Sequence, residues 1–312
     1  MSARQQTLAA PREARPAARR GEWREAITGW LFSAPFLILF ALFLALPILA
    51  SFIISLTDFS LGNLVDPLSA PFVGPRNYFR LFQDGVFRQA AVNTFIYVVF
   101  GVILNVAAGL AAALALNRGV GRFRALFRVG YYLPVVTSIV AIAVIWRFLF
   151  NVDLGLVNGL LSTFGIRGPD WLGNPVLAIA IITLLLVWRN FGNAMIILLA
   201  GLQGIPGDLY EAARIDGAGR WQEFRFVTMP MLRPTLLFVT VLTTIGFLQI
   251  FEEPFVMTQG GPLNRTLSVS MYVYRQAFNF FHQGYASAIA YTLFVVVAAI
   301  TFLQFRILRT QT

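Results

Sequence analysis

The chain alternates between long apolar blocks and short polar segments that hold most of its charge. A hydrocarbon core about 30 Å thick is crossed by roughly 20 apolar residues of helix, so a long block without charge predicts a membrane span. The charge-free stretches are 26–57, 89–117, 129–146, 171–188, 190–207, 234–251 and 276–305. They predict an all-α integral membrane protein with about six transmembrane helices. The predicted spans are 29–56, 92–116, 129–150, 175–199, 232–251 and 286–308.

Composition favours a membrane protein over a soluble one. Of the 312 residues, 58% are hydrophobic and 12% are charged, whereas soluble domains carry roughly 25% charged residues. The net charge of +10 does not indicate nucleic-acid binding, because the Arg residues lie in short segments between the apolar blocks. That distribution is typical of the residues that orient membrane helices.

The distribution of the 24 basic residues predicts the orientation. If the N-terminus is cytoplasmic, the inner segments and the adjoining ends of the spans hold 16 Arg, and the outer segments hold 6. Because positive residues concentrate on the cytoplasmic side, both termini are predicted to be cytoplasmic. In the outer segments, 77–89 and 154–164 are predicted to form short interfacial helices.

The chain is predicted to contain one membrane domain, 29–308, between two cytoplasmic tails. Residues 1–28 are polar and rich in Ala, Pro and Arg, which predicts a disordered tail. Residues 309–312 form the second tail. The apolar run after the first tail is far longer than the 7–15 residues of a signal-peptide core, so it is predicted to be an uncleaved membrane helix.

Several kinds of chemistry are excluded by composition. The chain has no Lys, which a Walker A loop requires, so it is not predicted to hold its own ATPase site. It has no Cys and a single His, His282, and it lacks a His-Glu-x-x-His motif. No catalytic or metal site is therefore predicted, and a membrane enzyme is disfavoured.

The polar segment 204–230 has the pattern of two short helices joined by a turn. Asp208 and Glu211 have the spacing of an N-cap residue and its capping-box partner. Gly217 is expected to end the first helix, and a second helix is expected to begin near Trp221. The segment is predicted to lie at the inner membrane surface, where its small residues permit close contact with a partner.

This segment resembles the membrane subunits of binding-protein-dependent ABC importers. Their hallmark is Glu-Ala-Ala, three residues, Gly, nine residues and Ile-x-Leu-Pro. The residues with this spacing here are Glu211, Ala212, Ala213, Gly217, Val227, Met229 and Pro230. The resemblance implies that 204–230 is a coupling helix that docks into a cleft on an ATPase subunit. The implied coupling residues are Glu211, Ala212, Ala213, Asp216, Gly217 and Pro230.

The resemblance also implies a bacterial or archaeal cytoplasmic membrane and a set of partners. These are a second permease subunit, a dimer of ATP-binding subunits and an extracytoplasmic substrate-binding protein, within the lipid bilayer and without nucleic acid. The chain itself is expected to bind no cofactor, because ATP is used by the partner subunits.

Three further segments resemble the sugar-permease branch of maltose and glycerol-phosphate type. They are Phe-Val-Gly-Pro-Arg-Asn-Tyr at 72–78, Thr-Gln-Gly-Gly-Pro at 258–262 and Gly-Tyr-Ala-Ser-Ala at 284–288. The second of these points to the first of the two permeases in such a pair. The branch implies a sugar or a related polyol as the substrate.

Polar residues in the predicted spans are candidates for the substrate pathway. Arg189 is a charge inside the fourth span, and such charges face a protein interior or a cavity. Asn190 and Asn193 share a helical face, and amides suit hydroxyl-rich ligands because they donate and accept. Gln249, Glu252 and Glu253 end the fifth span near the outer side, where they could line the pathway or mark the membrane interface. Two alternatives stay open: Arg189 could form a structural ion pair, and the Asn side chains could join helices.

The predicted function is that of a transmembrane permease subunit of an ATP-driven, binding-protein-dependent importer for a sugar or polyol. The alternative is a secondary transporter driven by an ion gradient. Such proteins often show internal repeats and acidic residues in mid-membrane, and neither feature is evident in this sequence. Neither that alternative nor an enzyme explains segment 204–230.

Overall fold

The structure is a computed structural model that describes residues 19–117, 119 and 123–309. Helices make up most of this part of the chain, and its one β-type pairing is an isolated bridge between Thr57 and Phe72. Five helices in the described residues are long and apolar enough to cross a membrane, and a bent pair could supply a sixth span. The predicted all-α membrane fold is confirmed.

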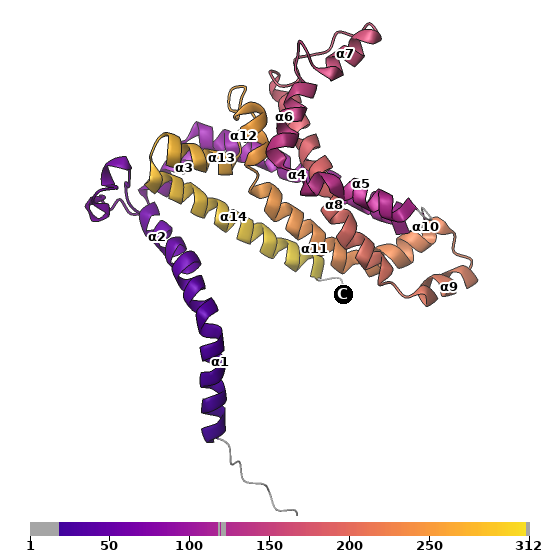
Figure 1. Ribbon diagram of the computed structural model, residues 1–312, viewed down its shortest axis with the longest axis horizontal. Helices are drawn as coiled ribbons and strands as arrows, with labels where there is room; N and C mark the ends of the chain where they lie inside the picture. Colours follow the sequence, from indigo (N-terminus) through magenta and orange to yellow (C-terminus); the bar gives the residue numbers. More distant parts are fainter. Residues whose placement is uncertain (1–18, 118, 120–122, 310–312) are drawn as a thin grey trace, which may run out of the picture. The chain divides into compact units, whose positions relative to one another are not determined.

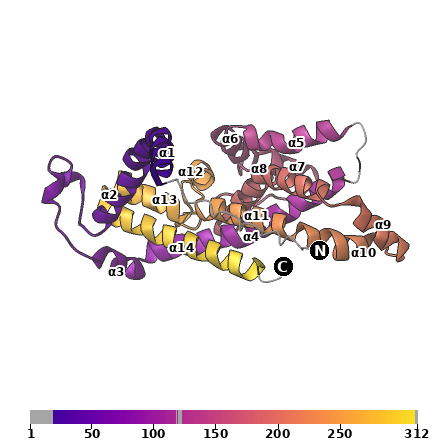
Figure 2. The same cartoon turned by 90° about the horizontal axis from the view of Figure 1, so that it is seen from below.

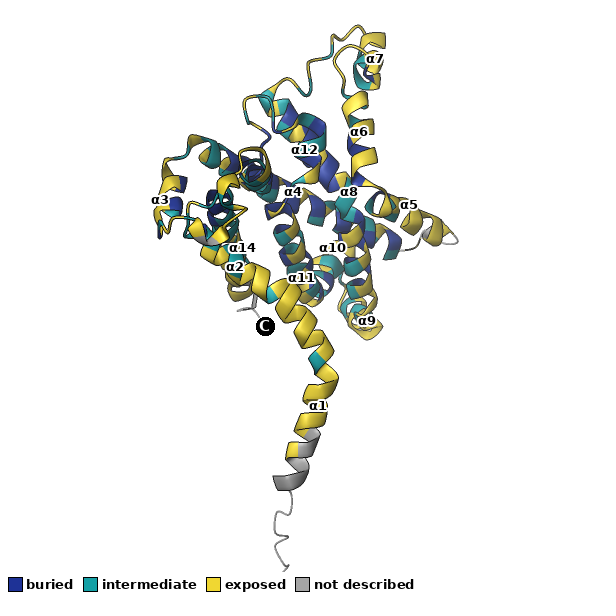
Figure 3. Cartoon of the chain, turned by 60° about the vertical axis from the view of Figure 1, so that its left-hand side comes forward, coloured by how far each residue is buried: buried dark blue, intermediate teal, exposed yellow. Residues whose placement is uncertain are grey.

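The chain forms two compact units, Met1–Ser51 and Phe52–Thr312. The helix α1 (Arg19–Phe40) continues through a π-helical turn (Ala41–Ala45) into α2 (Leu46–Ser55), whose last four residues belong to the second unit. From Ala26 onward this helix is apolar, and most of its residues are exposed (Figure 3).

The first helix begins at Arg19, so the predicted tail boundary at residue 28 is wrong for 19–28. The Glu, Arg and Ala residues of this stretch are good helix formers and no Pro interrupts it, so the membrane helix extends into the polar segment. Residues 1–18 of the predicted tail lie outside the described residues, as do residues 310–312 of the second tail.

Four long helices form the body of the second unit (Figures 1 and 2). They are α4 (Gly85–Asn117), α8 (Pro175–Gln203), α11 (Met229–Leu248) and α14 (Gln283–Arg309). They correspond to the predicted second, fourth, fifth and sixth spans. Two sets of short helices lie at opposite ends of this bundle: α3, α12 and α13 at one end, and α9 and α10 at the other (Figure 1). These are called the α3 end and the α9 end below.

The most extensive packing in the body is between α4 and α8, and a glycine allows the two helices to approach closely. A Cβ atom on Gly109 of α4 would lie 2.6 Å from the Cβ of Ala194 and 3.0 Å from the backbone nitrogen of Met195. Both neighbours belong to α8 and neither can move aside as a flexible side chain would. Small residues allow the backbones of membrane helices to approach closely, so this crossing depends on Gly109.

The predicted third span is not one continuous helix. The chain forms α5 (Arg124–Val136) and α6 (Ile139–Leu149), which meet at an angle of 94°. Pro134 removes a backbone donor in the last turn of α5 and so weakens the helix there. Thr137 then takes an extended conformation, with φ −83° and ψ 147°. The prediction of a single span over 129–150 is therefore wrong in its geometry.

The fifth span is longer at one end and shorter at the other than predicted. It runs continuously from α10 (Arg220–Gln222) through a π-helical segment (Glu223–Thr228) into α11. The two prolines near the start of α11 therefore follow helix instead of beginning it. The helix ends at Leu248, and residues 249–251 are non-helical before α12 (Glu252–Thr258) begins.

Short elements connect the long helices. They are a 3₁₀ turn (Leu61–Asn63), a second one (Pro67–Ser69), α3 (Arg76–Gln83), α7 (Leu156–Thr163), α13 (Val269–Tyr274) and a π-helical turn (Arg275–Asn279). The helix predicted over 154–164 matches α7. The one predicted over 77–89 is divided at Asp84, whose Oδ1 accepts hydrogen bonds from the N–H groups of Val86 (2.8 Å) and Phe87 (3.1 Å) and so starts a new helix.

Buried polar side chains of α4 tie this helix to the loop before α13. Asn93 donates to the carbonyl oxygens of Asn264 (2.7 Å) and Leu267 (2.9 Å). Tyr97 donates to the carbonyl oxygen of Thr266 (3.1 Å), and a backbone N–H of α13 donates to the hydroxyl of Thr94 (3.0 Å). Buried polar groups need such partners, and these bonds position the α3 end of the bundle.

Asp84 is also the centre of a polar network at the α3 end. Its Oδ2 accepts hydrogen bonds from the hydroxyls of Tyr272 (2.5 Å) and Tyr285 (2.7 Å). Burial raises the pKa of Asp84, but the hydrogen bonds from both tyrosines, Phe87 and Val86 together lower it below its ordinary value. The stabilisation is therefore present above the ordinary carboxyl pKa and is lost as the pH falls through the lower pKa of the folded state.

Replacing Asp84 by Asn should destabilise the protein by about 2 kcal/mol, because a single amide oxygen cannot accept the same four hydrogen bonds. The measurement is the free energy of unfolding by denaturant in detergent at neutral pH. Tyr272→Phe removes one of these bonds and should have a smaller effect. Equal stability of the Asp84→Asn variant and the original protein would contradict this role.

Candidate functional site

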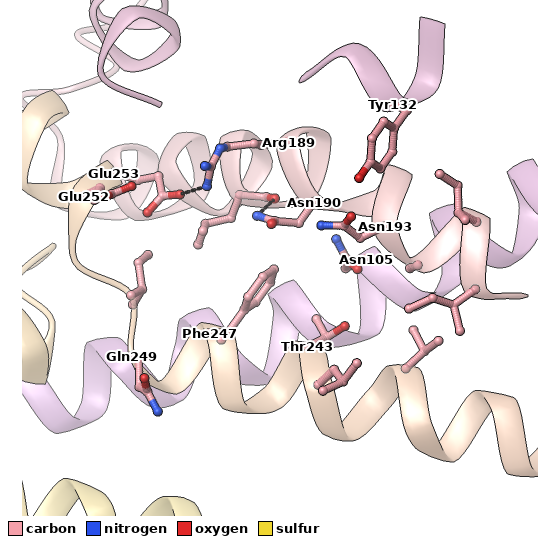
Figure 4. Close-up of a pocket in the computed structure, with 18 of the residues that line it drawn as sticks. Asn105, Tyr132, Arg189, Asn190, Asn193, Thr243, Phe247, Gln249, Glu252 and Glu253 are labelled. Atoms are coloured by element: carbon pink, nitrogen blue, oxygen red, sulfur yellow. Dashed lines mark hydrogen bonds and ion pairs between the residues drawn. The ribbon is translucent and has the colours of Figure 1, made fainter. Parts of the chain in front are cut away.

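A cavity of ≈ 660 Å³ lies between α4, α5, α8, α11 and α12 in the second unit (Figure 4). The structure places all five predicted pathway residues in its wall: Arg189, Asn190, Asn193, Gln249 and Glu252. They come from the middle of α8 and from the break between α11 and α12. Residues predicted from two separate spans therefore meet at one site.

The cavity has polar residues that the sequence did not single out. They are Asn105 of α4, Tyr132 of α5 and Thr243 of α11, and Glu253 of α12 also lies in the wall, beside the predicted Glu252. Asn105 stands in a long apolar stretch, which is a signal that could have identified it. Glu252 and Glu253 are neighbours of the same residue type, so the sequence does not show how each side chain points. Their directions depend on where α12 begins.

Arg189 pairs with Glu253 at one end of the cavity. The distance from Arg189 Nη1 to Glu253 Oε1 is 3.4 Å. The Glu253 side chain is 6% exposed and that of Arg189 is 23% exposed, so the pair is largely shielded from solvent. The buried Nε of Arg189 has no hydrogen-bond partner among the described residues, which leaves a donor in the cavity wall.

Amide side chains line the middle of the cavity. The Nδ2 of Asn190 donates to the carbonyl oxygen of Leu186 in its own helix (2.9 Å). The side chain of Asn193 is exposed. Asn105 is buried, and its Nδ2 lies 3.5 Å from the carbonyl oxygen of Val187. Amides in this arrangement offer donors and acceptors to a hydroxyl-rich ligand.

The segment at the α9 end forms the predicted helix, turn and second helix, but the second helix is not short, because it continues from Arg220 into the fifth span. The first is α9 (Gly207–Ile215), and Gly217 follows it with φ +82°, a conformation that favours glycine. The salt bridge between Arg214 Nε and Glu223 Oε1 (2.7 Å) joins α9 to the π-helical segment. The hydroxyls of Tyr210 and Thr228 lie 3.0 Å apart and make a second link.

The predicted capping pair of Asp208 and Glu211 is wrong. The residue before α9 is Pro206, and no side-chain hydrogen bond caps the helix. Asp208 instead lies within the first turn, where a negative charge still favours the helix dipole. Because Glu211 is not used as a capping partner, its exposed carboxylate is free to contact another molecule.

The implied coupling residues lie mostly on the surface. Glu211, Ala212, Asp216 and Gly217 are exposed, and Ala213 and Pro230 are half-buried. Large apolar side chains are exposed beside them: Ile215 (86%), Trp221 (70%) and Phe226 (69%). Apolar side chains gathered on an exposed surface are typical of an interaction site.

Comparison with known proteins identifies the family. Residues 105–310 match the family model described as "Binding-protein-dependent transport system inner membrane component". The lactose transport system permease protein LacF of Rhizobium radiobacter is 40% identical, over 89% of this chain and 93% of that protein. The trehalose/maltose transport system permease protein MalF of Thermococcus litoralis is 35% identical, over 92% and 95% of the two chains.

A solved structure shows the same fold. A chain from a bacterial ABC transporter that imports the acidic polysaccharide alginate matches with a TM-score of 0.81 and 25% identity, over 93% of this chain and 99% of that one. The predicted resemblance is confirmed, and the importer interpretation is favoured over a secondary transporter. The chain belongs to the family of inner membrane components of binding-protein-dependent transport systems, as a permease subunit whose ATPase is a separate protein.

Proposed function

We propose that this chain forms half of the pore of an ATP-driven importer and that its cavity takes a sugar or a related polyol. The observation that carries the proposal is the wall of amide side chains between α4 and α8, with Asn105, Asn190 and Asn193 in reach of one ligand. Relatives named for lactose and for trehalose and maltose support the substrate class. Because another relative imports an acidic polysaccharide, the family does not fix the charge of the sugar.

The α9 segment is the proposed contact with the ATPase. Glu211 and the exposed Ile215 offer one charge and one apolar side chain on a helix that the Arg214–Glu223 salt bridge fixes to the fifth span. A movement of the docked ATPase would be transmitted by this salt bridge from α9 to the fifth span, and side chains of α11 in that span line the cavity. Nucleotide and substrate would then act on one conformational equilibrium from two sites, which is allostery in the strict sense.

The α9 end is proposed to face the cytoplasm, with both chain termini on that side. The excess of Arg in the segments assigned to that side supports this orientation. The partners are a second permease subunit, two ATP-binding subunits and a binding protein on the opposite side. The binding protein would deliver the sugar at the α3 end, near which the Arg189–Glu253 pair lies.

Deletion of the gene in its host tests the function directly. Uptake of radiolabelled lactose, trehalose, maltose and arabinose oligosaccharides is measured in the deletion strain and after complementation. We expect the loss of uptake of at least one of these sugars and its return on complementation. ATP depletion should stop that uptake, and an ionophore that collapses ion gradients at constant ATP should not. Unchanged uptake of all four, or uptake that the ionophore abolishes, would contradict the proposal.

Replacing Asn190 or Asn193 by Ala should lower the uptake rate or change the sugar preference without preventing assembly. The loss of one hydrogen bond to a ligand hydroxyl should weaken the affinity for the sugar roughly fivefold to tenfold. The matched control is Gln203→Ala, which removes an exposed amide from the same helix away from the cavity. If both Asn variants transport the sugar as the control does, these residues are not ligand contacts.

A further inference from the structure

We propose that Arg189 and Glu253 together bind neighbouring hydroxyls of a neutral sugar, and that the charges around them reject acidic sugars. The inference rests on the proposed function and assigns its specificity to particular residues. It concerns a pair brought together from helices far apart in the sequence.

The geometry of the pair leaves most of its hydrogen-bonding capacity available. A guanidinium has five N–H donors in a fixed plane, and only Nη1 of Arg189 reaches a described side chain, Glu253. Their separation of 3.4 Å is longer than the roughly 2.8 Å that is usual between a charged nitrogen and a carboxylate oxygen. The Nε of Arg189 is buried without a partner among the described residues. The pair is therefore not a closed structural salt bridge.

A vicinal diol fits the donor and acceptor pattern of this pair. One hydroxyl can accept a hydrogen bond from the Arg189 guanidinium, and its neighbour can donate one to the Glu253 carboxylate. Each partner then keeps an oppositely charged group nearby, so neither buried charge is left isolated. Asn190, the next residue in α8, extends the polar wall from this point towards the middle of the cavity (Figure 4).

The charges that line the cavity favour a neutral ligand over an anionic one. Among the lining residues, Arg189 is the single cation, and Glu252 and Glu253 are both carboxylates. A sugar carboxylate bound to the remaining N–H groups of Arg189 would lie beside the carboxylate of Glu253, whose side chain is 6% exposed. The same ligand would also meet the charge of Glu252. Bringing like charges together in a site shielded from solvent is unfavourable, so an acidic sugar is disfavoured.

Ligand binding to the purified transporter tests this selectivity apart from transport. The two permeases with their ATPase subunits are placed in nanodiscs, and the separate binding protein is omitted so that its own selectivity does not contribute. Saturation-transfer NMR is recorded with lactose and with the disaccharide in which galacturonate replaces the galactose. We expect at least a tenfold weaker signal from the acidic disaccharide, corresponding to one unfavourable charge contact. Equal signals, a stronger acidic signal, or no signal from either probe would overturn the proposal.

Variants separate a ligand contact from a structural role. Glu253→Gln keeps the side-chain size but removes a charged acceptor, so it should reduce lactose binding about tenfold. The preference for lactose over the acidic probe should also decrease. Glu252→Gln should raise binding of the acidic probe. Asp153→Asn, an exposed position outside the cavity, is the matched control. A purely structural pair would lower both signals in proportion to the recovery of intact complex, and an unchanged ratio of the two would overturn the proposal.

The two failures are distinguishable. If gene deletion leaves sugar uptake unchanged, the proposed function fails whatever the NMR shows. If uptake is lost on deletion but the binding ratio does not depend on Glu252 and Glu253, the importer function stands and the assigned specificity is wrong.

Discussion

Replacing Glu211 by Lys should largely uncouple ATP-driven uptake while the protein remains inserted in the membrane. Glu211 is exposed on α9, is not used as a helix cap, and lies beside the exposed Ile215. Reversal of a charge at a docked interface costs several kcal/mol, so we expect transport to fall about a hundredfold. The fold should survive, because no buried contact depends on an exposed carboxylate at this position.

Three measurements on the Glu211 variant belong together: sugar uptake, the amount of ATPase subunit recovered with the permease, and ATP hydrolysis stimulated by the binding protein. Uptake and stimulation should fall together. Asp153→Lys makes the same change of charge at an exposed position on the α6–α7 segment and should leave all three unchanged. Full uptake by the Glu211 variant would remove the case for docking through α9.

Replacing Gly109 by Leu should prevent the protein from reaching its folded state. The Cβ of any larger residue would lie 2.6 Å from Ala194 and 3.0 Å from the backbone of Met195, and the remaining Leu atoms have no space between α4 and α8. Overpacking of a close-packed interior typically costs about 1–3 kcal/mol and occasionally more, and here both obstacles are fixed, so we expect about 3 kcal/mol or more.

The folded fraction of the Gly109 variant can be measured by size-exclusion chromatography in mild detergent. Gly130→Leu is the matched control, because Gly130 is also helical but a Cβ there would have no atom within 4 Å. The control should elute as the original protein does. If both Leu variants elute as a single sharp peak of the original size, the crossing of α4 and α8 tolerates a large residue and this packing argument fails.

The long helices could be predicted from sequence because their cause is local. A block of apolar residues long enough to cross the bilayer forms a helix, because hydrocarbon offers no hydrogen-bond partners and the backbone N–H and C=O groups must bond to one another. For the break between α5 and α6, Pro134 is a local signal of a weak point, but the size and direction of the bend could not be predicted in this way. Thr137 and Ser138 are compatible with a helix in a membrane, and the 94° bend depends on packing of α6 against its neighbours, among them α12.

Part of the candidate site could be predicted, because polar residues are conspicuous within an apolar block. Arg189, Asn190 and Asn193 were identified on that ground, and the structure brings them together with Gln249. The pairing of Arg189 with Glu253 was not predictable. Residues 249–251 are non-helical, and the helix axis of α12 takes a new direction after them. Sequence periodicity carries no information across such a break.

The hydrogen bonds of α4 have a consequence for how the protein is made. Ribosomes deliver the chain from the N-terminus, so α4 enters the membrane long before the loop at 264–269 exists. The partners of Asn93, Thr94 and Tyr97 on that loop are therefore absent until about 170 more residues have been synthesised. The α3 end of the bundle cannot close during the insertion of the first helices. Its closure is a late step of biogenesis, and a chain truncated before residue 264 keeps three polar side chains of α4 without their final partners.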